Sequence, residues 1–219
     1  MGSIFNGAPR TLIEEISKRV GINTFIETGT YYGETAIWAT KHFQNVYSIE
    51  ASEKYFEMAS RKYSQVQNLH LLLGNSASLL PKVISVTEPK RIFWLDAHFM
   101  GGTTYGQLGE CPLLAELTSI PTDSNSWILI DDARYFISQN FPILHDREQW
   151  PNIGEIVLIL SRVQESSVLF IFNDVIVSPP KSDVNLAKDI LYEAHRNTKK
   201  DIRNIYRNIR NVMTDLFTP

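Results

Sequence analysis

Short apolar runs alternate with helical patterns along most of the chain, and this alternation limits the possible folds more than any other feature. Five runs are apolar and are bounded by turn-forming residues, namely 24–28, 45–51, 68–75, 91–98 and 126–133. The segments between them keep the three- and four-residue spacing of helices. Buried strands that alternate with helices are typical of a parallel sheet with helices on both faces. The sequence therefore predicts an α/β fold with a doubly wound, Rossmann-like sheet.

The pattern changes after the fifth run. Residues 136–152 look irregular, residues 153–163 have a helical pattern, and two more apolar runs meet at Asn173 and Asp174. An Asn-Asp dipeptide suits a tight hairpin turn. We therefore expect a seven-stranded sheet that is mostly parallel and closes with an antiparallel hairpin. A chain of 219 residues is long enough to bury one substantial core.

Helical patterns also flank this core. Thr11 and Glu14 form a capping box and Gly21 stands where a helix would end, which predicts a leading helix over 11–20. We expect the main domain over residues 1–182 and a helical extension over 183–219.

The extension carries one narrow apolar stripe, and its residues are Ile202, Ile205, Ile209, Val212 and Leu216. Basic residues occupy the other faces of the same helix. We interpret it as a terminal helix that packs on its own domain or on a second copy, giving a homo-oligomer, rather than as a helix for membranes or nucleic acid.

Charge and composition exclude several classes of protein. The formal net charge is −3 and the pI is about 6.0, so nucleic acid is not expected as a partner. No run reaches the roughly 18 apolar residues of a membrane span. The single cysteine, Cys111, fits a reducing compartment, which makes a cytoplasmic location the expectation. Cys111 is better explained as a half-buried thiol than as a nucleophile.

Polar residues stand where the predicted strands end, and these are Glu27, Glu50, Asn75, Asp96, Asp131 and Asp132. The carboxyl ends of parallel strands meet at one edge of the sheet, and ligands bind there at the point where the strand order reverses. The sequence therefore places a ligand site at this edge.

The turn after the first strand indicates which ligand the site takes. Gly29 and Gly33 let the backbone approach a ligand closely, and Glu50 is placed to accept hydrogen bonds from a ribose diol. The dinucleotide motif G-x-G-x-x-G is absent, because two tyrosines occupy the turn. Glu27 would repel a pyrophosphate, but it suits the ammonium and sulfonium groups of S-adenosylmethionine.

The stretches "ETGTYYGET", "YSIEAS", "LLGNSASLLP" and "WLDAH", with the closing hairpin, resemble class I S-adenosylmethionine-dependent methyltransferases over roughly residues 22–180. By this resemblance, Glu27 holds the methionine ammonium, Glu50 binds the ribose, and Asn75 flanks the adenine. The resemblance implies a full cofactor-binding set of Glu27, Thr28, Gly29, Gly33, Thr35, Glu50, Asn75, Ser76 and Asp96.

Three of the acids at the strand ends suggest a metal-binding site. Asp96, Asp131 and Asp132 would repel one another unless they were protonated or bound a cation, and oxygen ligands favour Mg²⁺. The pattern resembles metal-dependent O-methyltransferases of the catechol and macrolide- or aminocoumarin-sugar types. That resemblance implies a metal that activates one of two vicinal hydroxyls, with Asp96 or His98 as the catalytic proton acceptor. Alternatively, the Asp pair caps the next helix or pairs with Arg134.

Taken together, these features predict metal-assisted O-methylation of a hydroxyl on a sugar, glycan or other small polyol. Residues 101–110 are glycine-rich and are interpreted as a lid over the acceptor. A nicotinamide-dependent oxidoreductase is one alternative, although it would require the missing glycine motif. A methyltransferase-fold module without turnover, which binds partners through the C-terminal helix, is the other.

Overall fold

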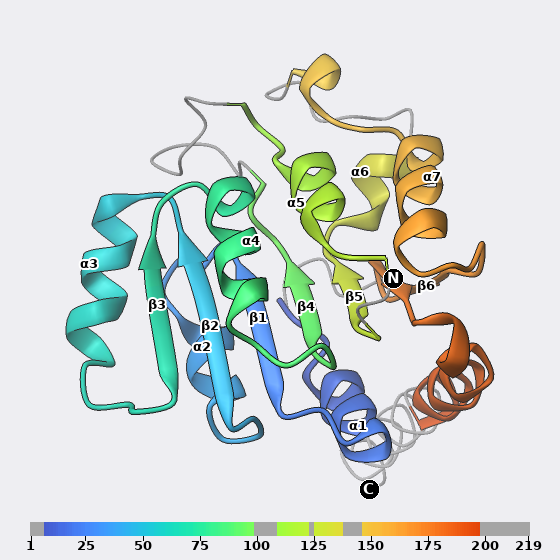
Figure 1. Cartoon of the computed structure of the whole chain (residues 1–219), viewed down its shortest axis with the longest axis horizontal. Helices are drawn as coiled ribbons and strands as arrows, with labels where there is room; N and C mark the ends of the chain where they lie inside the picture. Colours follow the sequence, from blue (N-terminus) through green and yellow to red (C-terminus); the bar gives the residue numbers. More distant parts are fainter. Residues whose placement is uncertain (1–6, 99–108, 123–124, 138–145, 198–219) are drawn as a thin grey trace, which may run out of the picture.

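The computed structural model describes residues 7–98, 109–122, 125–137 and 146–197. Within these residues, seven strands form one sheet in the order β3-β2-β1-β4-β5-β7-β6 (Figure 1). The strands are β1 (Thr24–Thr28), β2 (Asn45–Glu50), β3 (Leu69–Leu73), β4 (Ile92–Leu95), β5 (Trp127–Ile130), β6 (Phe170–Phe172) and β7 (Val175–Ser178).

The pairing of the strands confirms the predicted sheet. Strands β1 to β5 are all parallel, while β7 runs antiparallel between β5 and β6. Asn173 and Asp174 form the turn between β6 and β7, and both have positive φ, 47° and 70°. Asn and Asp tolerate this left-handed conformation better than most residues. Because β1 lies between β2 and β4, the strand order reverses beside β1.

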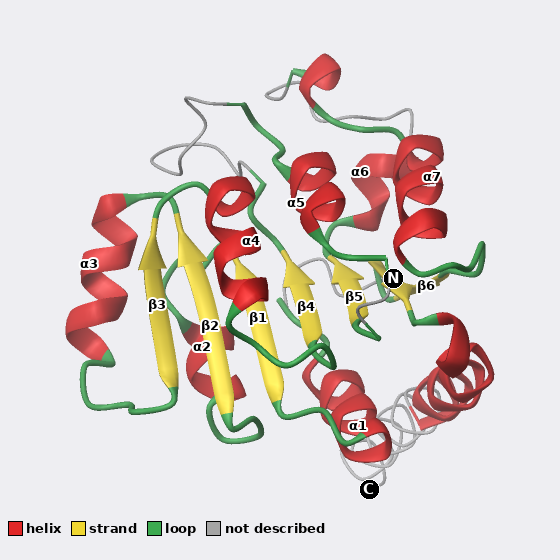
Figure 2. Cartoon of the chain, in the orientation of Figure 1, coloured by secondary structure: helices red, strands yellow, loops and turns green. Residues whose placement is uncertain are grey.

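Helices cover both faces of the sheet (Figure 2). They are α1 (Arg10–Val20), α2 (Glu34–Ala39), α3 (Glu53–Lys62), α4 (Ser76–Ser85), α5 (Leu113–Ser119), α6 (Ala133–Ile137) and α7 (Ile153–Val163), with short 3₁₀ turns at Arg147–Gln149 and Lys181–Asp183. One buried cluster joins the sheet to α1 and α2, and the other joins it to α4, α5, α6 and α7. These two layers of apolar contacts hold the strand ends in place.

The leading helix agrees with its prediction at one end only. Gly21 ends α1 with φ 72°, and its N–H donates to the Ser17 carbonyl at 2.8 Å. At the other end Pro9 is the N-cap residue and no side chain caps the helix, so the predicted Thr11 capping box is wrong. Thr11 instead lies inside the first turn.

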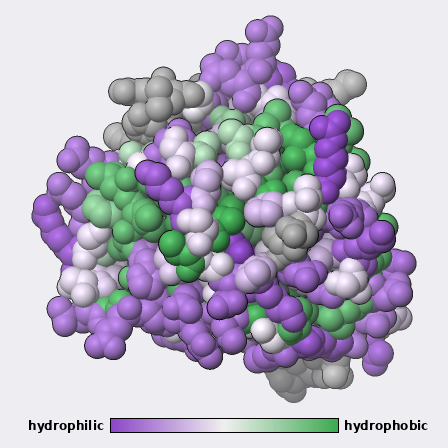
Figure 3. Space-filling view, in the orientation of Figure 1, coloured by the Kyte–Doolittle hydropathy of each residue, from purple (hydrophilic) through white to green (hydrophobic). Residues whose placement is uncertain are grey.

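The first part of the C-terminal extension packs on the sheet. Residues 184–197 are helical, and Ala187, Ile190 and Leu191 are buried in the same cluster as α1. The predicted apolar stripe over 202–216 lies outside the described residues, so its role in oligomerisation stays a prediction. Among the described helices, none has the length and apolarity needed to cross a membrane. Figure 3 shows hydrophilic residues interspersed with apolar patches on one face, as is usual for folded domains.

Candidate cofactor and acceptor site

The parallel strands bring the predicted site residues to one edge of the sheet. Glu27 and Thr28 end β1, Glu50 ends β2, and Asp96 follows β4. Asp131, Asp132, Asn75 and Ser76 lie at the corresponding ends of β5 and β3. All of them therefore lie at the edge toward which the β1–β5 arrows point in Figure 1.

Glu27 is buried beneath the first turn, and its side chain is held by hydroxyl groups. Ser48 Oγ hydrogen-bonds Glu27 Oε2 at 2.5 Å, and Thr30 Oγ1 lies 2.6 Å from Ser48 Oγ. Burial raises the pKa of Glu27 to about 8, although the Ser48 hydroxyl opposes the rise. In the part of the chain that the structure describes, Glu27 forms no salt bridge. A positively charged ligand group would stabilise its ionised form.

The two glycines of the first turn have internal reasons to be glycine. A Cβ on Gly29, whose φ is 85°, would lie 2.2 Å from the Asp96 carbonyl oxygen. A Cβ on Gly33 would lie 2.7 Å from the Tyr63 ring. From the sequence, we expected both glycines to let the backbone come close to a cofactor. Gly29 also lets the end of β1 contact the end of β4, since Asp96 N donates to the Thr28 carbonyl at 3.1 Å.

Glu50 connects the first turn to the end of β2. Its Oε2 accepts from the Tyr31 N–H and its Oε1 accepts from the Ser52 N–H, each at 2.8 Å. Burial raises the pKa of Glu50, and these backbone donors oppose the rise. A carboxylate oxygen can accept more than one hydrogen bond, so Glu50 is placed to accept from a ribose hydroxyl as well.

The remaining cofactor candidates lie at helix starts. Asn75 is the N-cap residue of α4 but makes no capping hydrogen bond through its side chain, and Ser76 is buried next to it. Thr35 lies half-buried in the first turn of α2. Thr28 is fully buried, and its hydroxyl oxygen lies 3.3 Å from Asp96 N.

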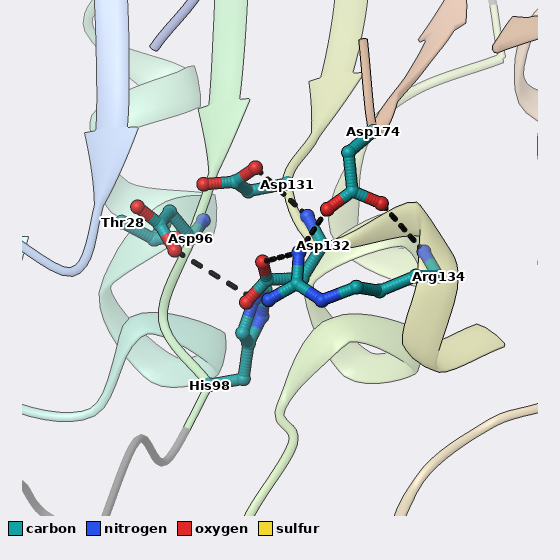
Figure 4. Close-up of polar contacts among 7 residues, drawn as sticks. All are labelled: Thr28, Asp96, His98, Asp131, Asp132, Arg134 and Asp174. Atoms are coloured by element: carbon teal, nitrogen blue, oxygen red, sulfur yellow. Dashed lines mark hydrogen bonds and ion pairs between the residues drawn. The ribbon is translucent and has the colours of Figure 1, made fainter. Parts of the chain in front are cut away.

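His98 lies among the aspartates that follow β4 and β5 (Figure 4). Its Nε2 lies 3.2 Å from Asp132 Oδ2 and 3.6 Å from Asp96 Oδ1. The imidazole side chain is only 2% exposed, and it packs against the rings of Phe136 and Trp150. His98 is therefore held between two carboxylates and two aromatic rings.

The charges of the three aspartates are unequal. Burial raises the pKa of Asp96 well above its usual value, and the nearby charges of Asp131 and Asp132 raise it further. Burial and the Asp132 charge raise the pKa of Asp131 to about 6. For Asp132, burial is outweighed by His98 and Arg134, so its pKa is lowered. Asp132 is therefore the most readily ionised of the three, and Asp96 is the one that most readily keeps its proton.

The described residues do not fit the predicted metal. No group of three or more His, Cys, Asp or Glu side chains among them is arranged to hold a metal ion. The reason is visible at Asp132, whose Oδ1 lies 2.6 Å from Arg134 Nη1 and whose Oδ2 faces His98. Asp131 Oδ1 accepts the Asp132 N–H at 2.8 Å. The alternative interpretation of the pair, an ion pair with Arg134, is present instead.

Three residues of this region were not predicted from the sequence. Ser48 supports Glu27, and Asp174 from the hairpin turn pairs with Arg134. Glu116 on α5 is buried, and its Oε1 has no hydrogen-bond partner among the described residues. Glu116 shares a helix face with the buried Leu113 and Leu117, and an acid on an apolar face is the signal that could have revealed it.

Two other predictions have different outcomes. Burial raises the pKa of the Cys111 thiol to about 12, which agrees with a thiol that is not a nucleophile at neutral pH. Most of the predicted lid, 101–110, lies outside the described residues. Glu110 itself accepts from Trp150 Nε1 at 2.8 Å and from the Asp146 N–H at 3.1 Å.

No protein-family model matches the sequence, and no curated protein matches it. Solved structures do match its fold. A provisionally assigned caffeoyl-CoA O-methyltransferase from Staphylococcus aureus has a TM-score of 0.54 at 12% identity, over 82% of this chain and 86% of that one. The methyltransferase PaMTH1 from Podospora anserina, solved with SAH, has a TM-score of 0.53 at 18% identity, over 77% of this chain and 76% of that one.

A third match is the O-methyltransferase TomG from Streptomyces achromogenes, solved with SAM. It has a TM-score of 0.51 at 14% identity, over 80% of this chain and 82% of that one. At such identities the likeness concerns the fold. The chain therefore has the fold of class I S-adenosylmethionine-dependent O-methyltransferases, as its sequence predicted.

Proposed function

We propose that the protein transfers the methyl group of S-adenosylmethionine to a hydroxyl group of a sugar or another small polyol. The observation that carries this proposal is Glu27. It is a buried carboxyl at the place where the strand order reverses, and it has no salt bridge among the described residues. A buried acid without a salt bridge is costly to ionise, and a ligand ammonium would compensate its charge.

The balance of charges around the site supports a cationic ligand. The charges of Asp131, Asp132, Glu27 and Glu116 all raise the pKa of Asp96, which shows how closely the acids gather. A pyrophosphate placed among these groups would be repelled, whereas a sulfonium would be attracted. This favours S-adenosylmethionine over a nicotinamide dinucleotide. The solved neighbours that contain SAM or SAH support the same choice.

The contacts of Glu50 and Asn75 suggest how the nucleoside would be held. Glu50 is fixed by two backbone donors and can accept further hydrogen bonds from the ribose. The Asn75 side chain is not used to cap α4, so its amide can face the adenine. Glu27 would then meet the methionine ammonium, as the sequence resemblance implies.

The exposure of the side chains distinguishes the roles of Asp96 and His98. The Asp96 side chain is 29% exposed and can meet an acceptor, whereas His98 is 2% exposed and lies behind it. Asp96 is therefore proposed as the proton acceptor and His98 as the residue that positions it. The raised pKa of Asp96 makes its ionised form a stronger base, and the positive charge of bound S-adenosylmethionine would favour that ionised form.

Bound S-adenosylmethionine supplies a methyl group on a positively charged sulfur that leaves as a neutral thioether. The acceptor oxygen forms the new C–O bond as the C–S bond breaks, and the electron pair stays on sulfur. Asp96 receives the hydroxyl proton. His98 keeps the carboxylate of Asp96 oriented throughout, and no step passes through a metal.

Calorimetric titration tests the cofactor. We expect S-adenosylhomocysteine to bind and NAD not to bind. Glu27→Gln should weaken binding by about tenfold or more, because it removes a hydrogen bond between charged groups. Glu57→Gln is the matched control, since Glu57 is an exposed residue of α3 and should leave the affinity unchanged. Binding of NAD without S-adenosylhomocysteine would refute the proposal.

The acceptor is tested by transfer of a labelled methyl group from S-adenosylmethionine to a panel of sugars and polyols. We expect base-stable methyl ethers, which distinguish O-methylation of a hydroxyl from methyl ester formation. Cofactor binding with no labelled product from any hydroxyl compound would favour the alternative of a binding module.

A further inference from the structure

We propose that the Arg134 guanidinium, held between Asp132 and Asp174, is the resident cation of the acceptor site and that the site works without a divalent metal. This inference deepens the proposed function and rests on it for the identity of the site. Its physical basis is that both oxygens of Asp132 already have partners, as Figure 4 shows.

The first step is the occupation of Asp132. Arg134 Nη1 lies 2.6 Å from Asp132 Oδ1, and His98 Nε2 lies 3.2 Å from Oδ2. The Asp132 side chain is only 9% exposed. A metal ion that used Asp132 would have to displace one of two charged or polar partners from a nearly buried carboxylate. Removing one partner of a nearly buried ion pair is strongly unfavourable, so these contacts oppose binding of a metal by Asp132.

The second step is that Arg134 is fixed in place. Its guanidinium pairs with Asp174 Oδ2, its backbone N–H donates to Asp174 Oδ1 at 2.8 Å, and Ala133 N donates to the Asp174 carbonyl at 2.8 Å. The guanidinium also lies 4.3 Å from the centre of the Tyr135 ring. Arg134 is therefore bound on three sides and is not a mobile surface arginine.

The third step concerns the fold. Asp174 comes from the β6–β7 turn, where it has a φ of 70°, and it lies 40 residues from Arg134 in the sequence. The turn thus brings a second carboxylate to the guanidinium that Asp132 already holds. A guanidinium stays protonated in proteins, so the positive charge is permanent.

The fourth step is the arrangement of the other acids. Asp131 directs Oδ1 to the Asp132 N–H, and in Figure 4 its carboxylate lies apart from the Asp132 carboxylate. The three acids that the sequence assigned to one ion are thus divided between different partners. The permanent positive charge of Arg134 lies next to the His98–Asp132 contact. It compensates the negative charge that a divalent metal ion would otherwise compensate.

Manganese binding to the wild-type protein, with S-adenosylhomocysteine added, tests the inference directly. Electron paramagnetic resonance reports free Mn²⁺, and we expect no saturable binding up to millimolar Mn²⁺. Saturable binding that is abolished by Asp132→Asn or Asp131→Asn would overturn the inference. If S-adenosylhomocysteine does not bind in the same samples, the proposed function is wrong, while the manganese result still decides the question of the metal.

The ion pair between Arg134 and Asp174 is tested by thermal unfolding of Arg134→Gln, Asp174→Asn and the double variant. We expect each single variant to lower the melting temperature. The double variant should have a melting temperature no lower than that of the less stable single variant, because each single substitution already removes the same ion pair. Arg61→Gln, which breaks an exposed pair with Glu57, is the control and should have little effect. Additive losses from Arg134→Gln and Asp174→Asn would show that the two residues do not act together.

Discussion

Glu27→Gln should make the free protein more stable, and the gain should grow with pH. Burial raises the pKa of Glu27 from the ordinary range of a glutamate to about 8. A group with a raised folded-state pKa contributes stability below its unfolded pKa, and that stability is lost as the pH rises toward the folded pKa. Glutamine has the same size, can still accept from Ser48, and cannot ionise.

The magnitude follows from the difference between the two pKa values. Between about pH 5 and pH 8 the folded state keeps a proton that the unfolded state has released, so the wild type loses about 1.4 kcal/mol per pH unit from this group. Over the whole interval the loss amounts to about 3–5 kcal/mol. The other acids titrate in both proteins, so they largely cancel when the variant is compared with the wild type.

Urea unfolding at several values between pH 5 and pH 8 measures the effect. The difference in unfolding free energy between Glu27→Gln and the wild type should increase with pH, whereas Glu57→Gln should show no such trend. A difference that stays constant over this range would refute the reasoning that burial penalises the Glu27 charge. Isothermal titration in buffers of different ionisation enthalpy should also show that cofactor binding releases a proton from wild-type Glu27 and none from the variant.

Three further predictions concern neighbouring residues. Gly29→Ala should lower the free energy of unfolding in urea by more than about 3 kcal/mol, because the new Cβ would overlap the Asp96 carbonyl oxygen. Gly21→Ala is the control and should cost only about 1 kcal/mol, because no atom lies within 4 Å of its Cβ. Asp96→Asn should abolish methyl transfer while calorimetry still detects cofactor binding; equal losses of both would show a structural role. Burial raises the pKa of Glu116, so the contribution of Glu116 to the free energy of unfolding falls as the pH rises above the pKa of the unfolded state. Glu116→Gln should therefore become more stable than the wild type between pH 5 and pH 8. A stability gain that does not depend on pH would contradict this prediction.

The strands and the edge of the sheet were predictable, because buried apolar runs and turn residues are local signals. The run at 24–28 matches β1 in full, and the Asn173–Asp174 turn occurs where the dipeptide suggested. Local signals also failed, as at Thr11, where Pro9 became the N-cap residue and the capping box did not form.

The pairing of side chains across the site was less predictable. Arg134 meets Asp174 across 40 residues and His98 meets Asp132 across 34. Sequence spacing places such residues at one edge, but it does not say which carboxylate receives which cation. The sequence therefore grouped three acids around an ion, whereas the fold divides them between a guanidinium, an imidazole and a backbone N–H. The pairing depends on where the hairpin turn lies relative to β5, which is a property of the whole sheet.

The contacts of α6 and of the turn at Arg147–Gln149 have a consequence for the order of folding. The start of α6 is fixed to Asp174, and the turn at Arg147–Gln149 is fixed by the contacts of Glu110 with Asp146 and Trp150. Each of these contacts joins residues 36–40 positions apart in the sequence. Closing such long loops costs entropy before the contacts form, so we expect α6 and the turn at Arg147–Gln149 to become ordered late in folding.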